Sequence, residues 1–142
     1  MYTWNESLRI GNAMVDDQHK QLFKIAEKVE SLLNECRPHS PALNKDTERQ
    51  QRVLRETIKY LKSYAINHFA AEEAYQRKVG YKGYDEHKKI HDDFAVAVER
   101  MEAKVYEENC SDECVNKFLE WFSAWLYNHI MYEDQRIVGN EN

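Results

Sequence analysis

The sequence has few of the residues that interrupt helices, because glycine occurs four times and proline twice in 142 residues. Proteins built from many short strands need turn residues more often than this. The three cysteines, Cys36, Cys110 and Cys114, form neither a CxxC nor a CxxCH motif. Their pattern argues against a secreted disulfide framework, a zinc ribbon and a covalently attached haem. The composition therefore predicts an all-α protein in a reducing, cytoplasmic environment.

Long apolar runs and a dominant charge are also missing. The longest strictly apolar run covers residues 94–98, far short of a membrane span, and the N-terminus lacks the basic start and apolar core of a signal peptide. The formal net charge is −5, from 20 basic and 25 acidic residues spread along the chain. No basic patch marks a surface for nucleic acid or for an anionic membrane. We therefore expect neither a nucleic-acid partner nor a membrane partner.

Apolar residues recur with a helical period in four stretches. The helices predicted from them cover residues of about 16–36, 46–79, 85–108 and 113–134. An irregular arm, residues 1–15, precedes them, Asp16 or Asp17 is the expected N-cap of the first helix, and the RPHSP segment at 37–41 ends it. The short connections make neighbouring helices antiparallel. The fold expected is an up-down-up-down four-helix bundle, one domain over residues 1–142.

Five of the six histidines fall on the apolar face of a predicted helix, and every helix carries at least one of them. These are His19, His68, His87, His91 and His129. One histidine on an apolar face is more often a hydrogen-bonded core residue than a metal ligand. Five buried imidazoles, with Glu72 four residues after His68, would however cost roughly 1–3 kcal/mol for each group left unsatisfied. Metal ligation removes that cost.

Counting along the antiparallel helices places these residues at one end of the bundle. His19 is near the start of the first helix, and His68 and Glu72 are near the end of the second. His87 and His91 lead the third helix, and His129 is near the end of the fourth. Chance placement would not gather them in this way, so the pattern predicts one shared site.

The number of ligands indicates two metal ions rather than one. Five imidazoles, Glu72 and one further carboxylate exceed the four ligands of a structural zinc site, and no thiolate joins them. If two carboxylates and a solvent-derived oxide or hydroxide bridge two six-coordinate ions, three histidines complete one ion. Two histidines leave the other with an open position for a small molecule. The donors alone do not select the metal, since imidazole suits several.

The sequence offers two candidates for the further carboxylate. At 100° per residue, Glu133 lies only about 40° around an ideal helix from His129, whereas Asp134 lies about 140° away. Ideal helix geometry therefore favours Glu133.

The ligand motifs resemble those of the hemerythrin family. They are QH at 18–19, HxxxE at 68–72, HxxxH at 87–91 and HxxxxD at 129–134, and the resemblance covers nearly the whole chain. It implies a non-haem centre of two iron ions that binds dioxygen reversibly, for storage, delivery or sensing. In this family the fifth residue after the last histidine bridges the metals, so the resemblance selects Asp134 over Glu133.

The resemblance also implies roles for the other residues. His87, His91 and His129 would bind the saturated iron, and His19 and His68 the iron with the open position. Four apolar residues match the family's oxygen pocket by their offsets from the ligands, although ordinary core packing explains each of them equally well. They are Leu22, Phe69, Trp125 and Leu126.

One position departs from the family. Better-known members have methionine one helical turn after Glu72, where this chain has Gln76. A polar side chain that faces the pocket would shorten the life of an oxygen adduct, whereas one that faces solvent would have no such effect. The sequence leaves both orientations open.

Two other functions compete with oxygen binding. One is a di-iron enzyme that reduces peroxide, oxygen or nitric oxide, and the other is an iron-responsive interaction module. Carboxylate-rich di-iron oxidases use Glu-x-x-His pairs, and the predicted ligands include no such pair. The imidazole-rich donor set therefore favours a binding protein over an enzyme.

Overall fold

The computed structural model describes residues 1–35 and 45–139, and most of these residues are helical. The four long helices are α1 (Ala13–Glu35), α2 (Lys45–Val79), α3 (Tyr84–Glu107) and α4 (Asp112–His129). A π-helical turn, η2 (Ile130–Asp134), and a short helix, α5 (Gln135–Gly139), continue α4 without a break. Within the two described ranges there is no strand, which agrees with the all-α prediction.

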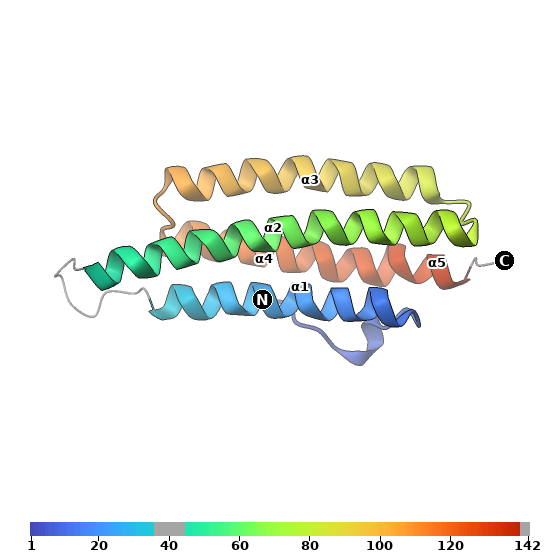
Figure 1. The fold of residues 1–142 in the computed structure, drawn as a ribbon, viewed down its shortest axis with the longest axis horizontal. Coiled ribbons are helices and arrows are strands. Elements are labelled where there is room, and N and C mark those ends of the chain that lie inside the picture. The colour runs from blue at the N-terminus through green and yellow to red at the C-terminus, as the bar shows by residue number, and fades with distance from the viewer. Residues whose placement is uncertain (36–44, 140–142) are drawn as a thin grey trace.

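The four long helices lie side by side and alternate in direction (Figure 1). α1 packs against α2 and α4, and α3 packs against the same two helices. This arrangement confirms the predicted up-down-up-down bundle. The start of α1, the end of α2, the start of α3 and the end of α4 meet at one end, on the right in Figure 1. No helix in the described part of the chain is long and apolar enough to cross a membrane.

The faces that the sequence predicted to be apolar are the faces that the bundle buries. Leu22, Ile58 and Phe118 are completely buried, and each such side chain contributes roughly 1.5–3 kcal/mol when it leaves water. Met101, on α3, is only half-buried. Cys36 and the RPHSP segment lie outside the described residues.

The first helix begins earlier than predicted, and the predicted N-cap is wrong. α1 starts at Ala13, and Asn12 caps it, because the Asn12 side-chain oxygen accepts a hydrogen bond from the Val15 N–H at 3.0 Å. Asp16 lies inside the first turn. Its carboxylate accepts hydrogen bonds from the backbone N–H of Ile10 at 2.8 Å and of Gly11 at 3.2 Å. Asp16 thus ties the arm to the helix, where an acidic side chain also suits the helix dipole.

The N-terminal arm packs across the bundle and contains one short 3-10 turn, η1 (Glu6–Leu8). Leu8 and Ile10 are buried. The Tyr2 N–H donates to the Ser123 hydroxyl at 3.2 Å, and the Gln135 amide donates to the Arg9 carbonyl at 3.2 Å. The arm therefore joins the first residues of the chain to α4 and α5.

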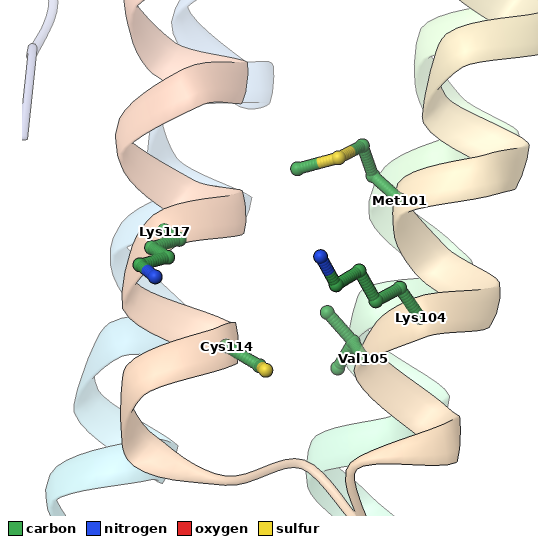
Figure 2. Close-up of a pocket in the computed structure, with 5 residues that line it drawn as sticks. All are labelled: Met101, Lys104, Val105, Cys114 and Lys117. Atoms are coloured by element: carbon green, nitrogen blue, oxygen red, sulfur yellow. The ribbon is translucent and has the colours of Figure 1, made fainter.

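Cys110 and Cys114, the two cysteines within the described residues, lie at the end of the bundle opposite the histidines. Cys114 lines a hollow of about 40 Å³ between α3 and α4, into which Met101 and Lys104 extend (Figure 2). Cys110 is buried, and burial raises the pKa of its thiol. Both are free thiols.

Candidate metal centre

The structure brings all seven predicted ligand residues together at the predicted end of the bundle. Each is at most 5% exposed, and three of the seven are completely buried. The exposed fractions are His19 0%, His68 2%, Glu72 0%, His87 1%, His91 1%, His129 5% and Asp134 0%. The residues form two groups of potential metal ligands that share Glu72. All four long helices or their continuations contribute a member.

Three histidines form the first group, with their Nε2 atoms directed toward one another. His129 Nε2 lies 3.0 Å from His87 Nε2 and 3.1 Å from His91 Nε2. His87 Nε2 is also 3.0 Å from Glu72 Oε1 and 3.0 Å from Asp134 Oδ1. A neutral imidazole carries one proton on two nitrogens, so three converging Nε2 atoms cannot all be satisfied by one another. A cation among them would satisfy all three.

The other two histidines face the opposite oxygen atoms of the same carboxylates. His19 Nε2 lies 3.4 Å from Glu72 Oε2 and 3.1 Å from Asp134 Oδ2. His68 Nε2 lies 3.2 Å from Glu72 Oε2. Glu72 and Asp134 therefore each turn one oxygen toward the three-histidine group and the other toward the two-histidine group. This is the arrangement of two carboxylates that bridge two ions.

The spacing of the donor atoms fits metal coordination better than hydrogen bonding. Two ligands at right angles, each about 2.1 Å from a metal, are about 3.0 Å apart, close to the separations within both groups. Among the described residues, the carboxylate oxygens of Glu72 and Asp134 and the Nε2 atom of His19 have no partner in hydrogen-bond geometry. Buried polar atoms rarely remain unsatisfied. The donor set thus fits two cations with octahedral-type coordination.

Asp134 reaches the cluster because the last helix is not regular. Residues Ile130–Asp134 form a π-helical turn, whose i→i+5 hydrogen bonding inserts one extra residue and aligns a side chain with the fifth residue before it. Asp134 is therefore aligned with His129 and completely buried. The side chain of Glu133 is 29% exposed and lies 3.8 Å from the Arg136 guanidinium. The ideal-helix argument for Glu133 is wrong, because the helix is π-helical here, and Asp134, the residue that the resemblance selects, lies among the donor atoms.

The ionisation of the cluster reflects the close approach of its groups. Burial opposes charge on His19 and His87, but contacts with Asp134 and Glu72 outweigh it and raise the pKa of each histidine to about 9. Burial lowers the pKa of His68. Despite burial, the surrounding imidazoles hold the pKa of Glu72 well below its usual range. Despite burial and the neighbouring Glu72 charge, His129 and His19 likewise lower the pKa of Asp134. Both carboxylates are therefore anions that attract cations.

Two polar residues outside the predicted set orient the ligands. His68 Nδ1 lies 2.7 Å from Gln18 Oε1, and His91 Nδ1 lies 2.9 Å from Glu73 Oε2. In each case the oxygen accepts the Nδ1–H and leaves Nε2 free to face the cluster, as in most histidine metal sites. Sequence reasoning missed this role. The only feature of the sequence that indicates this role is adjacency to a ligand, because Gln18 directly precedes His19 and Glu73 directly follows Glu72.

The four predicted pocket residues lie on the inner side of the cluster, toward the middle of the bundle. Leu22 and Leu126 are buried, and Phe69 is 5% exposed. The Phe69 ring stacks on His91 with centroids 4.0 Å apart, and the half-buried Trp125 stacks on His129 at 4.5 Å. Both aromatic residues therefore touch imidazoles of the three-histidine group. Together with the leucines they supply an apolar layer beside the donor atoms.

Gln76 is completely buried, so the orientation toward solvent is wrong. It does not join the apolar layer either. Gln76 lies seven positions after Phe69 on α2, about 10 Å along the helix axis, with Glu72 between them. Gln76 therefore lies on the outer side of the cluster.

Comparisons with known proteins agree with this donor set. Residues 11–139 match the family model described as the hemerythrin HHE cation binding domain. The chain is 30% identical over 139 residues to a bacteriohemerythrin of Clostridium acetobutylicum, an alignment that covers 97% of this chain and 99% of the relative. A bacteriohemerythrin of Campylobacter jejuni is 33% identical over 141 residues, with 96% and 92% covered, and a myohemerythrin of Theromyzon tessulatum is 29% identical over 138 residues, with 97% and 92% covered. The chain belongs to the hemerythrin family.

Proposed function

We propose that this protein binds dioxygen reversibly at a non-haem di-iron centre, held at the end of the bundle where α2 ends and α3 begins. In this assignment His87, His91 and His129 hold one iron, and His19 and His68 hold the other. Glu72 and Asp134 bridge the two ions. The observation that carries the proposal is the division of the two carboxylates, each of which turns one oxygen toward each histidine group.

The unequal histidine groups support an open position on one ion. The group with His19 and His68 has one imidazole fewer than the group with His87. With the same two carboxylates on both sides, the smaller group supplies one ligand less. When bound, two ferrous ions would supply the electrons for reversible binding of dioxygen.

The residues around the donor atoms favour reversible binding of dioxygen over an enzymatic reaction. Leu22, Phe69 and Leu126 are buried apolar side chains on the inner side of the cluster, and they keep water and protons away from that side. Reversible binding needs such a dry pocket. The ligand imidazoles are also held in place, since Gln18 and Glu73 accept the Nδ1–H groups of His68 and His91.

A cycle of oxygenation tests the proposal. The purified protein, reconstituted with ferrous iron without air, should contain close to two irons per chain and gain a visible absorption band when oxygen is added. Removal of oxygen under vacuum should restore the first spectrum over several cycles. Permanent oxidation in the first cycle would indicate the enzyme, tested next with peroxide and nitric oxide. Two irons with no response to oxygen would indicate the interaction module, and less than one iron per chain would refute the di-iron assignment.

A second part of the proposal is that the bound oxygen is used for storage, delivery or sensing. Storage, delivery and sensing all rest on the same chemistry at the cluster, and they differ in the oxygen affinity each requires. An oxygen titration of the ferrous protein separates them, because storage requires half-saturation near the ambient oxygen level and sensing requires it near the level at which the cell responds.

A further inference from the structure

Gln76 is a buried polar side chain that the proposed ligand set leaves unused. No part of it is exposed, and neither its carboxamide oxygen nor its nitrogen has a hydrogen-bond partner among the described residues. Side-chain amides that leave water are nearly always hydrogen-bonded, to protein or to an ordered water. The position of Gln76 indicates what this partner is.

Two contacts fix how α2 and α3 are aligned near the cluster. Glu73 on α2 accepts a hydrogen bond from His91 on α3 at 2.9 Å. One helical turn farther along α2, the Arg77 guanidinium donates to the Tyr84 hydroxyl at 2.7 Å. The two helices are antiparallel, so residues between Glu73 and Arg77 lie level with residues between His91 and Tyr84.

This alignment sets Gln76 level with His87. Both side chains are buried, and both belong to the faces of their helices that carry the cluster residues. The Nδ1 atom of His87 is also buried and has no hydrogen-bond partner in the described chain. Two unsatisfied polar groups therefore lie at the same level on adjacent helices, on the outer side of the cluster.

Their chemistry is complementary to one small molecule. His87 turns its Nε2 toward the carboxylates, so a metal on Nε2 leaves the hydrogen on Nδ1, and metal-binding histidines almost always donate that hydrogen to an acceptor. The Gln76 carboxamide offers both an acceptor and donors. A water molecule can accept from His87, donate to the Gln76 oxygen and accept from its nitrogen, which meets the usual requirement of two to four partners.

We propose that a water molecule is bound between the Gln76 carboxamide and His87 Nδ1, as an internal hydration site at the outer end of the metal cluster. The part played by His87 rests on the proposed function, because a metal on Nε2 fixes the tautomer. The part played by Gln76 does not, since its amide needs a partner in the metal-free protein as well.

Tyr81 closes this site toward solvent. The Tyr81 backbone N–H donates to the Gln76 backbone carbonyl at 2.9 Å. This bond spans the end of α2, which Gly80 follows with a φ of 71°. A Cβ atom at Gly83 would lie 2.7 Å from the Tyr81 ring, so glycine there lets the ring fold over the start of α3. The ring meets His87 edge-on, with centroids 6.3 Å apart. The bound water is therefore covered by a half-buried side chain and exchanges with solvent when that ring moves.

The site separates water from the oxygen pocket. Gln76 and the apolar layer lie on opposite sides of Glu72 along α2, so the hydration site brings a polar molecule to His87 without wetting Phe69. The protein thus has one dry side and one hydrated side at the same cluster.

Nuclear magnetic resonance on the ¹⁵N-labelled full chain tests the proposal, with Zn²⁺ in place of iron because it is diamagnetic. We expect cross-relaxation with water at the Gln76 side-chain amide in both the metal-free and the Zn²⁺-loaded protein, and at His87 Nδ1–H in the loaded protein. In Gln76→Leu the water signal at His87 should be lost. Gln21→Leu, the same change at an exposed position of α1, should leave it unchanged.

Two outcomes would overturn the proposal: no water contact at the Gln76 amide of the wild-type protein in either form, or a His87 signal that survives in Gln76→Leu. Both differ from a failure of the proposed function. Failure of the chain to bind two Zn²⁺ or two iron ions would refute the ligand assignment, but it would leave the Gln76 signal of the metal-free protein as a separate result.

Discussion

The choice between two adjacent carboxylates provides the sharpest test of the metal centre. Asp134 is completely buried, and its two oxygens lie 3.0 Å from His87 Nε2 and 3.1 Å from His19 Nε2. Glu133, one residue earlier, is partly exposed and lies 3.8 Å from Arg136. We predict that Asp134→Ala removes most of the bound iron and that Glu133→Ala leaves two irons per chain.

The expected sizes of the two effects differ widely. An ion present at 100 times its dissociation constant stabilises the folded state by about 2.7 kcal/mol, so the loss of two such ions costs about 5 kcal/mol. For a domain of this size that lowers the thermal midpoint by roughly 10–20 °C. Glu133→Ala removes one exposed ion pair, which contributes about 0.2–1 kcal/mol. Its midpoint should fall by no more than about 4 °C.

Metal analysis and thermal unfolding of the loaded and metal-free proteins measure both effects. The metal-free forms serve as the control, because Asp134→Ala also loses direct contacts with His19 and His129. Only the difference between loaded and metal-free midpoints reports metal binding. If Glu133→Ala abolishes that difference and Asp134→Ala preserves it, the π-helical turn does not exist in solution and the bridging assignment is wrong.

Three further results are expected. His91→Ala should lower the iron content and the thermal midpoint together, since metal that binds the folded state stabilises it; an iron-free wild type of equal stability would contradict this. Glu73→Gln should weaken metal affinity about 10–100-fold in a competition titration, because the carboxylate that orients His91 is lost, whereas Glu99→Gln, at an exposed site on α3, should not. In the metal-free protein His19 and His87 have pKa values raised from 6.5 to about 9, so the folded state binds more protons between these values. The free energy of unfolding, measured with denaturant, should therefore fall as the pH rises from 6.5 to 9, and a flat profile would show that these imidazoles are not paired with the carboxylates.

The bundle was predictable because one physical rule governs nearly all of it. Apolar residues at 3-4 spacing must share a helix face, and that face must be buried. Residues on these faces, among them Leu22, Ile58 and Phe118, form the core. The rule also placed the histidines, since they occupy the same faces as the leucines and phenylalanines around them.

The same rule does not describe helix ends and residues beside the ligands. The start of α1 depends on the Asn12 side chain and on Asp16, which holds two N–H groups of the arm. These are local hydrogen bonds with no apolar period. Gln18 and Glu73 lie next to ligands in the sequence but off the apolar face, so periodicity does not single them out. Only the contacts with His68 and His91 reveal their role.

The π-helical turn follows from two demands on the last helix. First, Trp125, Leu126 and His129 must all face the bundle, which a regular α-helix allows. Second, a carboxylate after His129 must lie at the outer side of the cluster and reach both histidine groups. A regular continuation would align residue 133 with His129, and Asp134 would turn away. One extra residue in the turn brings Asp134 into line and keeps Ile137, three residues later, in the core. Such turns are rare and occur most often at functional sites. Here the irregular backbone is the feature that completes the bridge between the two donor groups, and no pattern based on 100° per residue contains it.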